Sequence, residues 1–156
     1  MKLTVAAVGR MAPGPERTLV EDYLSRAGAA GRQMGLSPVS LTEIDERKAR
    51  GQAEQSEKLL ATVPSGAQIM ALDERGKGMT SPDFAKLLGR LRDQGVSETC
   101  FLIGGADGHT QALRDRSGLL LSFGPMVWPH MLARVMLAEQ LYRAVSILGG
   151  SPYHRA

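Results

Sequence analysis

The densest set of chemically active side chains lies at the C-terminal end of the chain. Gly149 and Gly150 end a long apolar segment, and Tyr153, His154 and Arg155 follow shortly after it. An aromatic ring can stack on a base, an imidazole can transfer a proton, and a guanidinium can hold a phosphate. A frayed polar terminus explains the same residues when they are taken alone. The residues by themselves leave both interpretations open.

Three glycine-rich or irregular loops, residues 73–78, 104–108 and 122–127, each follow an apolar run of strand length. Ligands of parallel sheets bind beyond the carboxyl ends of the strands, and glycines there let the backbone approach a ligand closely. Free amide and carbonyl groups in such loops suit an adenine ring or a sulfonium methyl donor. Turn formation alone accounts for each loop about equally well.

Several other kinds of site are disfavoured by the sequence. Residues 104–108 lack the glycine spacing of a dinucleotide fingerprint, which argues against a nicotinamide oxidoreductase, and residues 76–78 lack the upstream glycine of a phosphate loop. The three histidines and Cys100 are dispersed without ligand spacing, so we expect no metal site. No GxSxG motif is present, and Cys100 lies in an apolar run where a buried, inert thiol is expected.

The composition predicts a single globular domain over residues 1–156. Hydrophobic residues make up 43% of the chain and charged residues 22%, and no window approaches the roughly 18 apolar residues of a membrane helix. Cys100 has no partner for an internal disulfide, and the N-terminus lacks a secretory signal, so we expect a cytoplasmic protein with no membrane association. A net charge of +3 permits a polyanionic partner without indicating one.

Apolar runs and segments of helical length alternate along the chain, which predicts an α/β fold. Strands are expected at residues 3–8, 39–44, 67–72, 99–103 and 119–123, and helices at 16–27, 45–63, 81–91 and 129–148. Nearly continuous apolar runs at 67–72 and 100–103 are typical of strands covered on both faces, so we expect a parallel sheet between helices. In the helix at 81–91, Ser81 is the expected cap and Pro82 the first helical residue.

The last helix has more apolar surface than one core-facing stripe requires. Met131, Val135, Ala138, Tyr142 and Val145 form one stripe, and a second contains Leu137, Leu141 and Leu148. This pattern favours a dimer interface. Glu139 and Arg143 stand four residues apart on the same helix, and a solvated ion pair is the simplest interpretation of them.

Read in order, residues 72–77, 101–108 and 129–155 resemble the RlmH family, the SPOUT-class methyltransferases of ribosomal RNA. The resemblance covers essentially the full chain. It implies transfer of a methyl group from S-adenosylmethionine to N3 of a pseudouridine in large-subunit (23S) ribosomal RNA. Because no RNA-binding domain is appended, we expect the substrate to be the assembled ribosome. The resemblance also implies a homodimer and a SPOUT fold with a C-terminal trefoil knot.

The same resemblance implies a pocket for S-adenosylmethionine made by three loops. The residues carried over are Leu72, Gly104, Gly105, Phe123, Gly124, Pro125, Met126, Val127 and Trp128. The family pattern has a threonine at the position of Val127, so a hydroxyl is lost there, and Trp128 adds bulk. These two changes motivate an alternative function, a noncatalytic ribosome-associated RNA-binding module on the same scaffold.

The catalytic residues expected from the chemistry lie in the last helix and the tail. A uracil-type N3 must lose a proton before methylation, and His154 is the expected base, with His130 as its rival. Arg155 or Arg143 is expected to stabilise the anion or hold a phosphate, and Tyr153 to stack on a base. Two subunits that share the last helix would bring their tails together, so we expect a composite site at the dimer interface.

Overall fold

The structure is a computed structural model, and it describes residues 1–155. Its five strands form one parallel sheet in the order β2-β1-β4-β3-β5. The strands are β1 (Lys2–Val8), β2 (Val39–Ile44), β3 (Gln68–Lys77), β4 (Glu98–Ile103) and β5 (Leu119–Leu121). The helices are α1 (Pro15–Gly31), α2 (Gly51–Ala61), α3 (Ser81–Asp93), α4 (Gln111–Arg116) and α5 (His130–Leu148), with short 3₁₀ turns at Arg32–Met34 and Glu46–Lys48.

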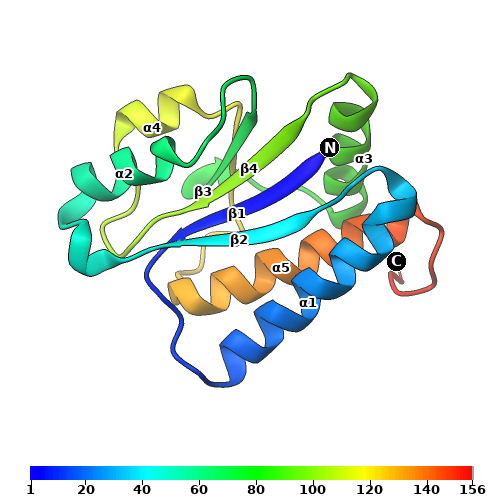
Figure 1. The fold of residues 1–156 in the computed structure, drawn as a ribbon, viewed down its shortest axis with the longest axis horizontal. Helices are drawn as coiled ribbons and strands as arrows, with labels where there is room; N and C mark the ends of the chain where they lie inside the picture. The colour runs from blue at the N-terminus through cyan, green and yellow to red at the C-terminus, as the bar shows by residue number, and fades with distance from the viewer. Residues whose placement is uncertain (156) are drawn as a thin grey trace.

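Helices cover both faces of the sheet, as the continuous apolar runs predict (Figure 1). On one face, Leu3 and Val5 of β1 pack in the core with residues of α1, α3 and α5. On the other face, Ala6 and Val8 pack with Leu59 of α2 and Leu113 of α4. Successive residues of a strand point to opposite faces, so β1 contributes to both cores. The α/β architecture with a parallel sheet is therefore confirmed, whereas the trefoil knot stays a prediction.

The first of the three expected loops is part of a strand. β3 continues to Lys77, although residues 73–76 leave the ladder, because Leu121 pairs with both Leu72 and Lys77. Gly76 permits this excursion to lie close to β5, since a Cβ there would lie 2.6 Å from the carbonyl carbon of Leu120. The sequence prediction ended this strand at Leu72 because charged residues follow, and that end was wrong.

Two helix predictions also need correction. The cap of α3 is Thr80, whose hydroxyl accepts a hydrogen bond from the Asp83 amide at 3.2 Å, while the Ser81 hydroxyl donates to Gln140 on α5 at 2.7 Å. The segment expected as one helix at 45–63 divides into a 3₁₀ turn and α2. Gly51, at a φ of +77°, marks the division.

Within residues 1–155, no helix is long and apolar enough to cross a membrane, and no cluster of three or more His, Cys, Asp or Glu side chains could hold a metal ion. Cys100 is buried, and burial raises the pKa of its thiol to about 12, as expected for an inert side chain.

Candidate cofactor cleft and C-terminal cluster

A cleft of about 370 Å³ lies where β3, β4 and β5 end. Eight of the nine residues expected to bind the cofactor line it, and Pro125 does not. The lining residues from that set are Leu72, Gly104, Gly105, Phe123, Gly124, Met126, Val127 and Trp128. Three segments that are distant in sequence thus meet at one cleft, because parallel strands bring their carboxyl ends to the same edge of the sheet.

The second loop of the cleft is held by α2. Gln52 Nε2 donates to the carbonyl oxygens of Asp107 and His109 at 2.9 and 3.1 Å, and the Thr110 amide donates to Ser56 Oγ at 3.0 Å. Gln52 itself lines the cleft, and sequence reasoning missed it because a glutamine on a polar helix carries no motif. These bonds fix the loop to α2.

An ion pair forms another wall of the cleft. Arg114 Nε lies 2.6 Å from Asp73 Oδ2, and both side chains are largely buried. Burial alone would raise the pKa of Asp73, but hydrogen bonds from the Arg75 amide and from Arg114 lower it below its ordinary value. The carboxylate is therefore kept charged at the edge of the cleft.

The third loop presents apolar side chains at the surface. Met126, Val127 and Trp128 have exposed fractions of 73%, 88% and 42%. The loop turns at Gly124, whose φ is +104°, and its amide donates to Ser122 Oγ at 3.1 Å. The Val127 side chain is largely in solvent, so the missing threonine hydroxyl leaves no buried group of this chain without a partner.

The C-terminal residues form a separate cluster with the last helix. The Tyr153 hydroxyl donates to Glu139 Oε1 at 2.9 Å, and Arg143 donates to the same oxygen through Nε and Nη2 at 2.9 and 2.5 Å. Arg143 Nη1 lies 3.2 Å from His154 Nδ1. The structure thus brings together Arg143, Tyr153 and His154, while Arg155 remains exposed.

This cluster corrects the interpretation of Glu139 and Arg143 as a solvated pair. Their side chains are only 17% and 24% exposed, and the carboxylate also binds Tyr153. Burial and the Glu139 hydrogen bond raise the pKa of the Tyr153 hydroxyl, so Tyr153 remains a donor. The tail is therefore folded onto α5, and the frayed-terminus interpretation is wrong for residues 153 and 154.

The cleft lies at the N-terminal end of α5, and the C-terminal cluster lies along the second half of the helix. His130 and Ala133 line the cleft, whereas Arg143 lies about 15 to 20 Å further along the helix axis at 1.5 Å per residue. Figure 1 shows the C-terminus at the end of α5 that is remote from the carboxyl end of β1. Within a single chain, therefore, the cleft is not lined by Arg143, Tyr153, His154 or Arg155.

Comparison with known proteins identifies the family of the chain. The family model described as predicted SPOUT methyltransferase matches residues 1–154. The chain belongs to the SPOUT methyltransferase family. It is 58% identical to a protein of Dinoroseobacter shibae, 55% identical to one of Maricaulis maris and 50% identical to one of Paracoccus denitrificans, each over 99% of both chains. All three relatives are named ribosomal RNA large subunit methyltransferase H.

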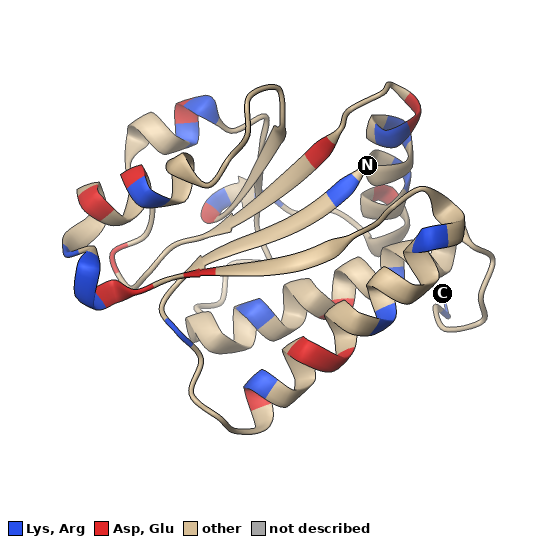
Figure 2. Cartoon of the chain, viewed as in Figure 1, with Lys and Arg blue, Asp and Glu red and all other residues tan. Residues whose placement is uncertain are grey.

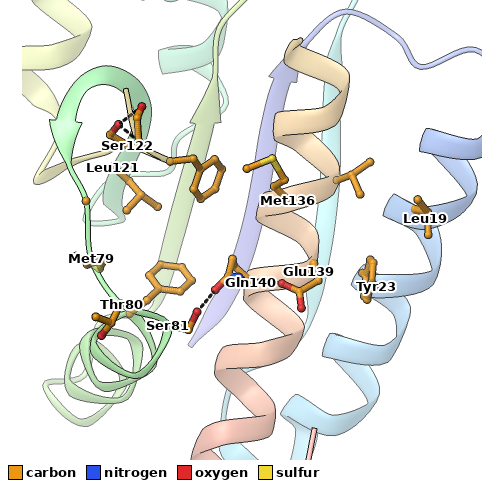
Figure 3. Close-up of a pocket in the computed structure, with 15 residues that line it drawn as sticks. Leu19, Tyr23, Met79, Thr80, Ser81, Leu121, Ser122, Met136, Glu139 and Gln140 are labelled. Carbon is orange, nitrogen blue, oxygen red and sulfur yellow. Dashed lines mark hydrogen bonds between the residues drawn. The ribbon is translucent and has the colours of Figure 1, made fainter. Parts of the chain in front are cut away.

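The SPOUT methyltransferase chain also carries an apolar groove of about 510 Å³ beside α5. Figure 3 shows Leu19 and Tyr23 of α1 on one side of it, Met79 on the other, and Met136 and Glu139 of α5 along its floor. Phe84, Leu121, Phe123 and Val135 complete its apolar lining. Val135 and Met136 of α5 therefore border this groove, whereas Leu137, Ala138, Leu141 and Val145 of the two expected stripes are buried in the core.

A buried histidine makes the stability of this SPOUT methyltransferase depend on pH. His109 is 1% exposed, and burial lowers its pKa below the ordinary value. The unfolded chain then binds a proton that the folded chain resists, so the free energy of unfolding should fall as the pH drops below about 6.5, by at most about 1.4 kcal/mol per pH unit for one group. Urea unfolding between pH 7.5 and 5 measures this slope.

The comparison variant for that measurement is His109→Leu, which removes the titrating group and fills a similar volume. We expect its slope to be smaller than that of the wild type. The free energy of unfolding of this variant should still depend on pH, because burial and Arg134 also lower the pKa of His130. An unchanged slope in His109→Leu would contradict the assignment to His109.

Proposed function

We propose that this chain transfers a methyl group from S-adenosylmethionine to N3 of a pseudouridine in large-subunit ribosomal RNA. The observation that carries the proposal is the meeting of Leu72, the Gly104–Gly105 loop and the loop at 123–128 around one cleft. The names of the three relatives support the same reaction class and RNA. The donor and the modified atom come from the resemblance of the motifs.

The residues of the cleft fit such a donor. Its volume of about 370 Å³ falls within the roughly 300–1,000 Å³ of small-molecule sites. A Cβ at Gly104 would lie 3.2 Å from the Gly108 carbonyl carbon, so a larger residue there requires the loop to shift, and one at Gly105 would meet the end of the Gln55 side chain at 2.7 Å. Glu74 and Asp107 supply carboxylates that complement a sulfonium cation, while the charge of Asp73 is balanced by Arg114.

S-Adenosylmethionine supplies a methyl group already activated by its positive sulfur. The chain must then hold the target base in line with that methyl group and favour loss of the N3 proton. We assign these tasks to the C-terminal cluster: His154 acts at the reacting edge of the base, Arg143 and Arg155 hold phosphate or anionic charge, and Tyr153 stacks on a base. Leu72 and the loop backbones hold the donor.

We further propose a homodimer in which the cluster of one subunit serves the cleft of the other. The separation of the two along α5 supports this arrangement. The apolar groove and the exposed Leu132, Met126 and Trp128 provide surface that a second copy would bury. Exchange of tails across such an interface would complete two identical sites.

The proposed partner is ribosomal RNA in the assembled ribosome. Acidic and basic residues are interspersed on the same helices in Figure 2, and the chain carries a net charge of only +3. A surface of this kind gains little from nonspecific attraction to phosphates, so recognition should depend on the shape of an assembled target. We place this activity in the cytoplasm and assign it to one domain spanning residues 1–156.

The experiment incubates the purified protein and labelled S-adenosylmethionine with unmethylated ribosomes and, separately, with free ribosomal RNA. We expect N3-methylpseudouridine by mass spectrometry of nucleosides from the ribosomes. No transfer to either substrate by a folded protein that binds S-adenosylmethionine would contradict the proposed reaction. A folded protein that binds ribosomes without binding S-adenosylmethionine would support the noncatalytic alternative.

A further inference from the structure

Glu139 is the residue on which the contacts of the C-terminal cluster converge. Its Oε1 accepts hydrogen bonds from the Tyr153 hydroxyl and from two nitrogens of Arg143, and its Oε2 accepts one from Gln140 Nε2 at 2.9 Å. Both carboxylate oxygens are thus engaged, and the side chain is 17% exposed. Figure 3 shows Glu139 on the side of α5 that carries the groove, near Tyr23.

Aromatic packing adds further order to the same side chains. The Arg143 guanidinium carbon lies 4.8 Å from the centroid of the Tyr153 ring, and the rings of Tyr142 and Tyr153 are 4.7 Å apart by their centroids. Arg143 is therefore fixed by Glu139 on one side and by an aromatic face on the other. A side chain held in this way can position a third group accurately.

The third group is the imidazole of His154. Arg143 Nη1 lies 3.2 Å from His154 Nδ1, and a guanidinium has only donors. Nδ1 must therefore accept in this hydrogen bond, and the neutral ring then carries its single proton on Nε2. The ring nitrogen left for a substrate is a donor.

We propose that Glu139 is a positioning residue that, through Arg143, fixes His154 as the Nε2–H tautomer, and that this N–H donates to a carbonyl oxygen of the target base. The inference rests on the proposed function. N3 loses its proton to water, and its electron pair forms the bond to the methyl carbon while the carbon–sulfur bond breaks onto sulfur. Charge on the N3 anion spreads to the adjacent carbonyl oxygens, where a fixed N–H donor stabilises it.

This assignment refines the role of His154. A base acting through Nε2 requires that atom to be unprotonated, which in a neutral ring puts the proton on Nδ1, opposite the Arg143 donor. The geometry opposes that tautomer. In this proposal His154 therefore stabilises the N3 anion. It does not act as the general base that a histidine at this position would suggest.

Nuclear magnetic resonance of the ¹⁵N-labelled full chain, without RNA, tests the tautomer directly. Long-range correlations between ring nitrogens and carbon-bound ring protons distinguish the two tautomers, and comparison with His154→Gln assigns the signals among the three histidines. We expect Nε2–H for His154 in the wild type and in Glu57→Gln, a control at an exposed glutamate of α2. We expect a mixture of tautomers in Glu139→Ala and in Arg143→Lys.

An Nδ1–H tautomer in the wild type would overturn the proposal, as would an unchanged Nε2–H signal in both Glu139→Ala and Arg143→Lys. Arg143→Lys provides a second reading if Glu139→Ala does not fold. These measurements use no substrate, so they stand whether or not the wild type methylates ribosomes.

Turnover on ribosomes gives the second readout. We expect Glu139→Ala to lower kcat by about tenfold or more with little change in KM for S-adenosylmethionine, because Glu139 lines the apolar groove and not the donor cleft. Glu139→Gln should recover part of this loss, since its amide oxygen still accepts from Tyr153. Wild-type kcat in Glu139→Ala would overturn the positioning role.

Discussion

A mixed dimer of two inactive variants should regain about half of the wild-type turnover per dimer. One subunit carries Gly104→Val, which displaces the loop at 104–108 because a Cβ there would lie 3.2 Å from the Gly108 carbonyl carbon, and the other carries alanine in place of Tyr153, His154 and Arg155. Each homodimer should lose at least about 100-fold in kcat/KM, because it lacks either the donor site or the groups that align the base. In the mixed dimer, the intact cleft of one subunit meets the intact tail of the other.

Two different affinity tags allow the mixed dimer to be purified away from both homodimers, and methyl transfer to unmethylated ribosomes measures its turnover. If cleft and tail acted within one chain, each subunit of the mixed dimer would still carry a defect, and the mixed dimer would be as inactive as its parents. That result would contradict the composite site. A wild-type dimer that carries both tags controls for any effect of the tags.

The reason for expecting so large a recovery is the geometry of α5. The helix begins at the cleft with His130 and ends near the cluster, so its length separates donor from tail within one chain. The cluster is held by contacts within its own chain, through Glu139. An ordered cluster that lies far from the cleft of its own chain is what the proposed use at the cleft of a second subunit requires.

The sequence predicted most of the fold because strands that are buried on both faces of a sheet have nearly continuous apolar runs. The strand at Val39–Ile44 has the predicted limits, and the others differ at one or both ends. The extension of β3 to Lys77 was missed because Lys77 pairs with Leu121, a partner more than 40 residues away, after residues 73–76 leave the ladder. Local residue type does not reveal such a contact.

The candidate site shows a similar division. Loops after parallel strands converge for a topological reason, which is why eight of nine expected lining residues are found together. Gln52 and Glu139 were missed, since one binds backbone carbonyls across 55 residues and the other gathers a tail 14 residues away. An ion pair at a spacing of four residues is common on exposed helices, so the spacing alone gave no sign of the cluster.

Replacing Arg134 by methionine should lower the free energy of unfolding by about 3 kcal/mol. Arg134 is 1% exposed, and its Nη1 lies 2.7 Å from Glu43 Oε2 while Nη2 donates to the carbonyl oxygens of Val8 and Gly9 at 3.1 and 3.0 Å. Methionine fills part of the volume but leaves these carbonyls without their donor. The Glu43 side chain is 28% exposed and can reach water. We therefore expect a loss near the lower end of the roughly 3–5 kcal/mol that breaking a buried ion pair costs.

Urea unfolding measures this loss, and two further variants test its origin. Arg47→Met removes a surface partner of Asp45 and should leave the unfolding midpoint nearly unchanged, since the Arg47 side chain is 79% exposed. Glu43→Gln should cost less than Arg134→Met, because an amide oxygen still accepts from Arg134 and both carbonyl bonds remain. Equal losses for these two variants would place the whole effect in the ion pair and contradict the role of the carbonyls. If Arg134→Met costs more than Glu43→Gln, Arg134 fixes the first turns of α5 to the carboxyl ends of β1 and β2 through both the ion pair and the carbonyl bonds. These contacts then determine the position of α5 and of the C-terminal cluster on it.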